Sequence, residues 1–338
     1  MPGLRRMWFA AMLALLLPAC GETTSSPLPG SGLKVCVVAG PAGFNDHGFN
    51  QLALQGAHTT GANVRSLTAR SASDYPTSVH KCVTKDTNLV VAVGGDFGNP
   101  VWKAAESYPS VHFAIVDGTA LDDAGRPAEL PNVTDLIFQP QGAGYLVGVL
   151  AGLMEKEKIG NATHGVTGIL GFNHSPPVDA YIAGYVAGAR SVNPALKIKL
   201  AYSDSPDPAA CKQIGIQQVS GGADILFEVT GGCRLGYIAA AYDSSAYAIG
   251  SDTDLAGDSP AVITSAIKKV DRAVAALVTQ LANKQPKAGP QVFDLRNDGT
   301  GFTTPSSVVP QDIINQVEDI RAKIRSGTIT PPSTVPAL

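Results

Sequence analysis

The feature that most constrains the fold is a repeated alternation of short apolar runs, rich in β-branched residues, with longer helix-like stretches. Runs of this kind occupy residues 33–39, 63–67, 89–93, 112–116 and 133–138, and a second series follows at 165–171, 197–202, 224–227 and 246–250. Apolar strands separated by helices indicate a parallel sheet covered on both faces. We therefore predict an α/β fold with two similar halves.

The stretches between and after these runs predict several helices. Residues 141–157 contain many small residues, which favours a helix that packs closely on its neighbours and carries the chain from one half into the other; an ordinary buried core helix is the alternative. The pattern over 265–281 predicts an amphipathic helix, and 311–325 predicts another. We expect the proline-rich tail, 331–338, to be loosely held.

Length and charge narrow the kind of protein. About 305 residues follow the amino-terminal segment, which suits two lobes rather than one small core. We expect residues 33–138 with about 256–285 in the first lobe, and 139–255 with about 286–330 in the second. The net charge of -3, without a cluster of basic residues beyond the first few, argues against a nucleic-acid partner.

The amino terminus predicts export and lipid attachment. Arg5 and Arg6 precede an apolar run at 7–17 that is too short to span a membrane, and Leu17 to Gly21 resembles the processing site of bacterial lipoproteins. Residues 1–20 then form a signal peptide whose Cys20 receives the lipid, with plain secretion as the alternative. We expect residues 21–32 to be a flexible tether, and the protein to be extracytoplasmic and held to a bacterial membrane by its lipid.

Four cysteines remain once Cys20 is assigned to the lipid, and an even number in an exported protein predicts two disulfides. Three pairings are open, and spacing alone does not choose among them. Pairing Cys36 with Cys82 and Cys211 with Cys233 would keep each bridge within one lobe. No cysteine or histidine spacing typical of zinc is present, so we expect no metal site.

The loop after the first predicted strand, residues 43–50, carries two aromatic rings, two amides and a carboxylate. Loops at the carboxyl ends of parallel strands are where open α/β sheets bind small molecules. Rings can stack on a flat apolar group while amides and a carboxylate bond hydroxyls, so a nucleoside would suit this loop. Asp96, Asp117 and Asp252 also follow predicted strands, although an aspartate there often only caps a helix or turn.

Two other motifs have competing interpretations. The glycine-rich segment 231–236 could place backbone amides against a ligand, or could be a tight turn; it lacks the spacing of phosphate-binding loops. The aspartates of 252–258 have a faint similarity to the calcium-binding cluster of nucleoside hydrolases, but a polar turn explains them without metal.

Taken together, the chain resembles the basic membrane protein family of bacterial lipoproteins, whose nucleoside-binding members serve ATP-binding-cassette importers. The resemblance covers nearly the whole mature chain. The segments that carry it are Asp46 with Gly48-Phe49-Asn50-Gln51 and Gly56, and residues 108–117, 142–148, 183–189, 250–254 and 264–271.

The resemblance implies a type I periplasmic-binding-protein fold, in which two Rossmann-like lobes joined by a hinge close over a purine nucleoside. Asn45 and Asp46 would contact the base, Phe49 would stack on it, and Asn50 would support the loop or the sugar. Asp117 and Asp252 would hold ribose hydroxyls or the base edge, Gly232 would allow close backbone approach, and Lys268 would reach a ribose hydroxyl. Without the resemblance, the sequence predicts that Lys268 is a surface lysine on an amphipathic helix.

One departure from the family pattern bears on specificity. Where members carry a second aromatic that sandwiches the base, this chain has Pro206, so that face is missing or is supplied by Phe172 or Tyr202. We expect a monomeric, non-enzymatic nucleoside-binding protein without cofactor that delivers its ligand to an ABC permease. The alternatives are an extracytoplasmic sensor with the same cleft and a nucleoside hydrolase.

Overall fold

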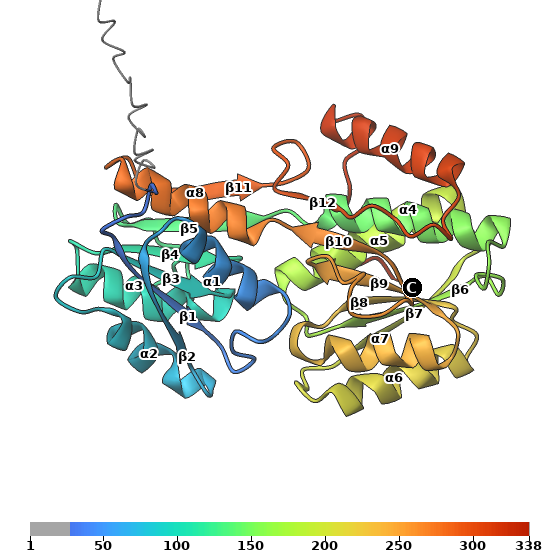
Figure 1. The fold of residues 1–338 in the computed structure, drawn as a ribbon, viewed down its shortest axis with the longest axis horizontal. Helices are drawn as coiled ribbons and strands as arrows, with labels where there is room; N and C mark the ends of the chain where they lie inside the picture. Colours follow the sequence, from blue (N-terminus) through green and yellow to red (C-terminus); the bar gives the residue numbers. More distant parts are fainter. Residues whose placement is uncertain (1–27, 338) are drawn as a thin grey trace, which may run out of the picture.

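A computed structural model describes residues 28–337 and contains two α/β lobes that lie side by side (Figure 1). The first lobe is built on a sheet with the strand order β11-β5-β4-β3-β1-β2, in which every pairing is parallel. Its strands are β1 (Lys34–Ala39), β2 (Asn63–Thr68), β3 (Leu89–Val93), β4 (His112–Val116), β5 (Val133–Phe138) and β11 (Gly289–Phe293).

Helices cover both faces of this sheet, as its apolar strands require. α1 (Phe49–Thr59) and α8 (Val270–Ala282) pack on one face, and α2 (Tyr75–Cys82) and α3 (Gly98–Ser107) pack on the other. β3 and β4 are buried along their whole length. Burial on both faces explains why these strands read as continuous apolar runs rather than as an alternation.

The second lobe repeats the plan with the strand order β12-β10-β9-β8-β6-β7, and only β12 runs antiparallel to its neighbour. Its strands are β6 (Val166–Gly171), β7 (Lys197–Tyr202), β8 (Ile225–Val229), β9 (Tyr247–Asp252), β10 (Val262–Lys268) and β12 (Thr300–Phe302). α4 (Gln141–Glu157), α5 (Pro176–Val192) and α9 (Gln311–Arg325) cover one face, and α6 (Pro208–Ser220) and α7 (Arg234–Asp243) cover the other.

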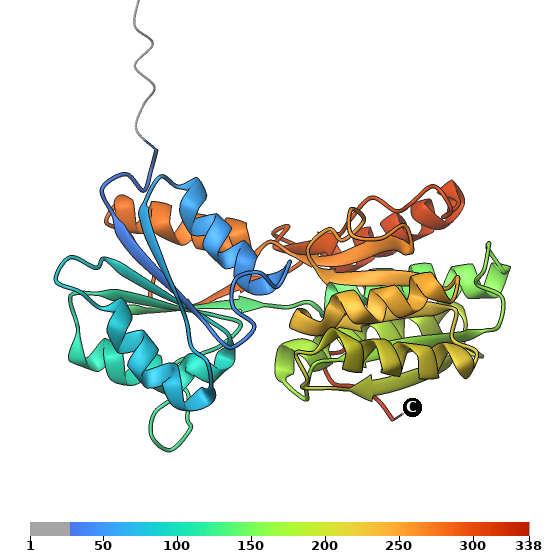
Figure 2. The same ribbon diagram turned by 60° about the horizontal axis from the view of Figure 1, so that its bottom comes forward.

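The chain passes between the lobes at three places: from β5 to α4, from β10 to α8, and from β11 to β12. Figure 2 shows these connections as the thin part of the molecule between the two sheets. The strands β5, β10 and β11 lead into these connections, so the carboxyl end of each points toward the other lobe. The carboxyl ends of both parallel sheets are therefore brought toward one cleft.

The predicted amphipathic helix at 265–281 is wrong at its start. β10 occupies Val262–Lys268 and pairs with both β9 and β12, and the helix α8 begins only at Val270. Hydrogen bonding to two neighbouring strands overrides the helical spacing of the side chains. The apolar face of α8 itself, with Val270, Val274 and Leu277, is buried as expected.

The division of the carboxyl-terminal third also differs from the expected one. The pairing of β10 places 262–268 in the second sheet, and the pairing of β11 with β5 places 289–293 in the first. The tail lacks regular structure, but Val335 packs against the core of the second lobe. The expected signal peptide, Cys20 and most of the tether lie outside the described residues.

The helix at 141–157 is α4, and its small residues permit close packing on α5. A Cβ added at Gly144 would lie 2.2 Å from the carbonyl oxygen of Tyr181, and one at Gly148 would lie 2.2 Å from that of Tyr185. Nearly the whole of α4 is buried. It is therefore both the buried core helix and the helix that brings the chain into the second lobe.

Candidate ligand-binding cleft

The cleft residues lie at the ends of strands from both lobes. The first lobe contributes the loop between β1 and α1 and, after β4, Asp117. The second contributes the turn after β8, the last residue of β9, Asp252, and the last residue of β10, Lys268. The sequence prediction that polar residues after strands meet at one edge is consistent with this placement.

An ion pair joins the lobes at the base of the cleft. The Nζ atom of Lys268 lies 2.5 Å from a carboxylate oxygen of Asp117 and 3.8 Å from one of Asp252. The side chains of Lys268 and Asp117 are each only 5% exposed. Burial raises the pKa of the Asp117 carboxyl above its ordinary value, and the charge of Lys268 opposes that rise. Lys268 is thus a cleft residue and not a surface lysine.

The two aspartates share an unusual backbone conformation. Asp117 has a φ of 54° and Asp252 a φ of 66°, both in the left-handed region that non-glycine residues seldom adopt. Asp117 also accepts a hydrogen bond from the backbone N–H of Phe138. Strained backbone of this kind is often found at binding sites.

Aromatic rings flank the ammonium group of Lys268. Its Nζ lies 5.2 Å from the ring centroid of Phe49, in the first lobe, and 5.0 Å from that of Tyr181, in the second. Both distances fit cation–π contacts. Sequence reasoning missed Tyr181, which lies in the interior of α5 and whose O–H donates to the carbonyl oxygen of Ala266.

Asp46 and Asn50 shape the loop at the entrance of α1. The Asp46 carboxylate accepts hydrogen bonds from the backbone N–H groups of Gly48 (3.1 Å), Asn50 (2.8 Å) and Gln51 (3.1 Å). The side-chain amide of Asn50 donates to the carbonyl oxygen of Gly43. Asp46 therefore satisfies the free amides of the helix start, in addition to any contact it makes with a ligand.

The other expected ligand residues are more open. Asn45 is exposed and Phe172 is 36% exposed. Gly232 lies across from the first lobe, where a Cβ would meet the Cβ of Ala42 at 3.6 Å. Gly231 beside it has a φ of 63°, as expected of the tight-turn interpretation.

The segment near Pro206 offers no second ring of its own. Pro206 is exposed, and the ring of Tyr202 packs against His174 with centroids 3.8 Å apart. The O–H of Tyr202 donates to Asp179 at 2.7 Å. Tyr202 is thus engaged within the second lobe, which leaves Phe172 as the freer of the two aromatic candidates.

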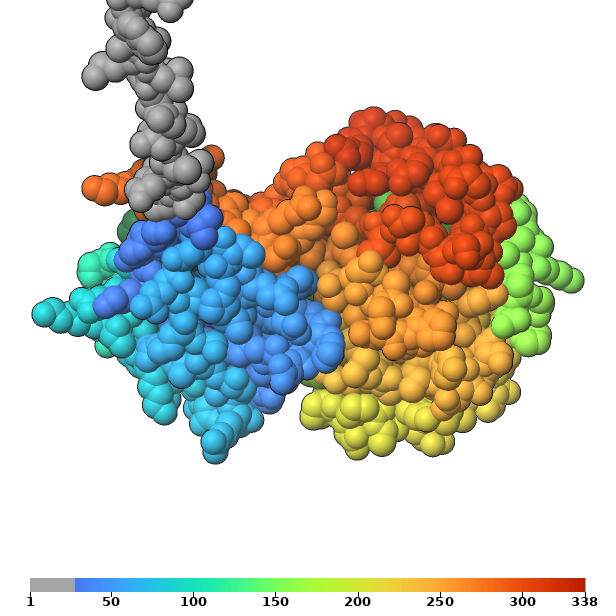
Figure 3. Space-filling view, in the orientation of Figure 1, coloured from blue at the N-terminus to red at the C-terminus, as the bar shows by residue number. Residues whose placement is uncertain are grey.

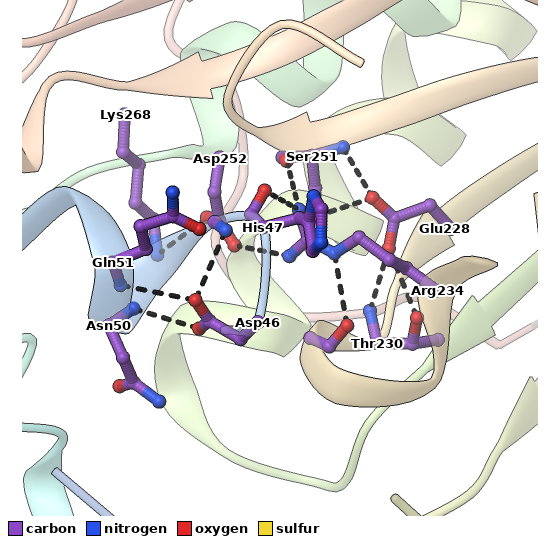
Figure 4. A network of polar contacts seen from close by, with 12 residues as sticks. Asp46, His47, Asn50, Gln51, Glu228, Thr230, Arg234, Ser251, Asp252 and Lys268 are labelled. Carbon is purple, nitrogen blue, oxygen red and sulfur yellow. Dashed lines mark hydrogen bonds and ion pairs between the residues drawn. The ribbon is translucent and has the colours of Figure 1, made fainter. Parts of the chain in front are cut away.

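Arg234 is the cleft residue that sequence reasoning missed most clearly. It is the first residue of α7, only 1% exposed, and its guanidinium reaches the first lobe at the carbonyl oxygen of His47 (Figure 4). A nearby carboxylate, Glu228, is fully buried and accepts hydrogen bonds from Thr230 and Ser251. The signal that could have found Arg234 is a charged residue directly after a glycine-rich turn at the end of an apolar strand.

A small cavity lies between the two lobes. It has a volume of about 130 Å³ and is lined from the first lobe by His47, Gly48 and α1, and from the second by residues of 253–258. Asp254 and Asp258 line it without joining a metal-binding cluster: in residues 28–337 no group of three or more histidine, cysteine or acidic residues is arranged to hold a metal. Figure 3 shows the two lobes meeting along this side of the molecule.

Two disulfides are present, with the pairing that keeps each within one lobe. Cys36 of β1 bonds Cys82 at the end of α2, and Cys211 of α6 bonds Cys233 in the turn before α7. All four residues are buried. The second bridge attaches the turn that carries Gly232 and Arg234 to α6.

Two lobes with mostly parallel sheets and a polar cleft between them define the type I periplasmic-binding-protein fold. A solute-binding protein of an ABC transporter system from Aeropyrum pernix K1 has a similar structure, with a TM-score of 0.77 and 22% identity over 89% of this chain and 94% of that one.

The family model described as ABC transporter substrate-binding protein PnrA-like, Bmp, matches residues 33–334, and the chain belongs to that family. It is 28% identical to the ABC transporter nucleoside-binding protein BmpA of Lactococcus lactis subsp. cremoris, over 94% of this chain and 95% of the relative. It is 27% identical to an uncharacterized lipoprotein of Pyrococcus furiosus, over 87% and 80%. Within residues 28–337, no helix is both long enough and apolar enough to cross a membrane.

Proposed function

We propose that this protein is a lipid-anchored, extracytoplasmic receptor that captures a purine nucleoside between its lobes and delivers it to an ABC importer. The observation that carries the proposal is the meeting of Asp117 with Lys268 and Asp252 in a buried position between the lobes. Carboxylates and an ammonium beside an aromatic ring suit a ligand with both hydroxyls and a flat heterocycle. The nucleoside-binding relative supports the same ligand class.

Each expected ligand residue has a proposed task within this scheme. Phe49 stacks on the base, while Asn45, Asp46 and Asn50 contact or support it from the loop. Asp117, Asp252 and Lys268 bind the ribose hydroxyls, with Gly232 allowing the opposing backbone to approach. Phe172 is the candidate for the second face of the base, because Tyr202 already packs on His174.

Closure of the two lobes is the mechanism that the proposal requires. A ligand held by residues of both lobes contacts them all only when the lobes are closed, so binding shifts the open and closed populations by its differential affinity. The protein would then present a closed, loaded form to the permease as a monomer held by the lipid on Cys20. It performs no chemistry on the ligand.

The test uses the protein without residues 1–20 and a panel of purine nucleosides, pyrimidine nucleosides, free bases and pentoses. We expect purine nucleosides to raise the unfolding temperature by an increment that grows with ligand concentration. Absence of a shift with every nucleoside would refute the ligand assignment. Liberation of free base during incubation would instead favour the hydrolase alternative.

A substitution separates stacking from general effects. Phe49→Ala should weaken nucleoside binding by about 1–3 kcal/mol, the scale of base–aromatic stacking. Tyr242→Ala is the matched control, because Tyr242 is an exposed aromatic residue on α7. Titration calorimetry that finds equal affinity for both variants would exclude the stacking role of Phe49.

A further inference from the structure

The guanidinium of Arg234 is a lobe-spanning group to which the proposed ligand contacts give no role. Arg234 belongs to the second lobe, where its Nε donates to the carbonyl oxygen of Gly231 at 3.0 Å. Its Nη1 donates to the carbonyl oxygen of Ser251 at 3.2 Å, and its Nη2 lies 3.4 Å from a carboxylate oxygen of Asp252. These contacts hold the planar group in one orientation.

The same group reaches across the cleft. Its Nη1 also donates to the carbonyl oxygen of His47 at 3.3 Å, in the loop of the first lobe (Figure 4). Both partners belong to the protein, so this contact favours an arrangement in which the two lobes touch at this point, independently of any ligand. This bond is partly buried, and a charged donor makes a stronger hydrogen bond than a neutral one.

Gly48 provides the space that this contact needs. A Cβ at Gly48 would lie 2.6 Å from both terminal nitrogens of Arg234 and 2.8 Å from its central carbon. All three of the nearest atoms belong to Arg234. The loop of the first lobe therefore fits the guanidinium of the second closely, and a side chain at position 48 would push the two apart.

The surrounding charges explain why a cation is stable in this buried place. Asp252, Glu228 and Asp46 are the charged groups that attract Arg234. Asp46 belongs to the first lobe and the other two belong to the second, so charge attraction as well as the hydrogen bond to His47 joins the lobes. The disulfide between Cys211 and Cys233 attaches the turn before Arg234 to α6. It thereby restricts the position of the Arg234 backbone.

We propose that Arg234 is a positioning residue for ligand capture, which bridges to the loop at His47 and Gly48 and so raises the closed fraction of the protein before ligand binds. The effect on closure stands on protein contacts alone. The effect on affinity rests on the function proposed above, because a ligand binds more tightly to a receptor whose competent form is already populated.

The experiment measures lobe closure without ligand. Thr77 on α2 and Gln217 on α6 are exposed, and these two helices lie on the side of each lobe away from the connections (Figure 1). Both are changed to cysteine and spin-labelled in protein that lacks residues 1–20. The four remaining native cysteines form two disulfides and so do not take the label. Pulsed EPR then gives the distribution of distances between the lobes.

The decisive variant is Arg234→Lys, which keeps a positive charge but has a single terminal nitrogen. It therefore lacks the planar fork whose Nε bonds Gly231 while Nη1 bonds Ser251 and His47. We expect the ratio of closed to open protein to fall about tenfold, as loss of one charged hydrogen bond predicts. Gly48→Ala should open the lobes as well, through the clash with the guanidinium. Lys212→Ala, on the exposed face of α6, should leave the distances unchanged.

An unchanged distance distribution in Arg234→Lys would overturn the inference, and so would a variant that loses thermal stability while its lobes stay closed. Adding guanosine then separates this inference from the proposed function. Guanosine that closes every variant, with affinity lowered about tenfold in Arg234→Lys, is the result expected. Opening of the variants together with no response to any nucleoside would refute the proposed ligand but leave the bridge established.

Discussion

A buried pair of carboxyl groups in the second lobe should make the stability of this protein depend on pH. Glu155, at the end of α4, and Asp224, before β8, are 4% and 5% exposed. Glu155 Oε2 accepts from the backbone of Gly165, and Asp224 Oδ2 accepts from those of Thr163 and His164. Their other oxygens, Oε1 and Oδ1, have no partner within the described residues.

One proton held between the two carboxyl groups would satisfy both of these oxygens. Burial and the adjacent Asp224 raise the pKa of Glu155 from 4.5 to about 9. The folded protein therefore binds a proton that the unfolded chain releases above pH 4.5. Folded-state stability from this group is fully present below that pH, and it is lost as the pH rises toward 9.

The magnitude follows from the difference of one proton. The free energy of unfolding should fall by up to about 1.4 kcal/mol per pH unit, which amounts to about 3 kcal/mol between pH 5.5 and 7.5. Glu155→Gln keeps the shape and offers an N–H to Asp224 without a titrating proton. We expect the free energy of unfolding of Glu155→Gln to lack this dependence on pH. The variant should therefore be more stable than the parent at pH 8.5.

Urea unfolding at a series of pH values, followed by circular dichroism, measures the slope for both proteins. Glu157→Gln is the matched control, because Glu157 ends the same helix and is exposed. Parallel curves for the parent and Glu155→Gln would refute the shared proton. A variant less stable than the parent across the whole range would show that the ionised carboxylate is the stabilising form.

The remaining predictions concern a disulfide, the cleft ion pair and helix packing. Replacing Cys36 and Cys82 with alanine opens a loop spanning 46 residues and should lower the free energy of unfolding by about 4 kcal/mol in urea titrations. Lys268→Met leaves the buried Asp117 carboxylate unpaired, so stability should fall by about 3–5 kcal/mol and nucleoside affinity with it; unchanged calorimetric affinity would remove Lys268 from the site. Gly148→Ala forces α4 away from a backbone carbonyl of α5, and an unfolding temperature equal to that of the parent would contradict the close packing.

The sequence alone predicted most of the secondary structure because apolar strands and helices leave periodic patterns. The runs at 89–93, 112–116 and 133–138 coincide with β3, β4 and β5. The segment 262–268 could not be read in the same way. The predicted helix, 265–281, included its last four residues, and only the two neighbouring strands that bond to the segment make it β10.

Several cleft residues were identified from their place after strands, since parallel strands bring their carboxyl ends to one edge. Asp117 and Asp252 were found in this way, and Lys268 was found through the family resemblance. Tyr181 and Arg234 were missed because their places depend on how α5 and the turn after β8 pack in three dimensions. Asp46 was found, but its three bonds to backbone amides were not foreseen.

The sequence by itself determined that this chain folds into two α/β lobes with a polar and aromatic loop after the first strand, because strand hydrophobicity and loop composition are local properties. The tertiary structure decided which strand ends face each other. Lys268 and Asp117 are 151 positions apart, and Arg234 is 187 positions from His47, yet each pair is in contact. No local pattern encodes such contacts, since they depend on three crossings between lobes that bring distant segments to one cleft.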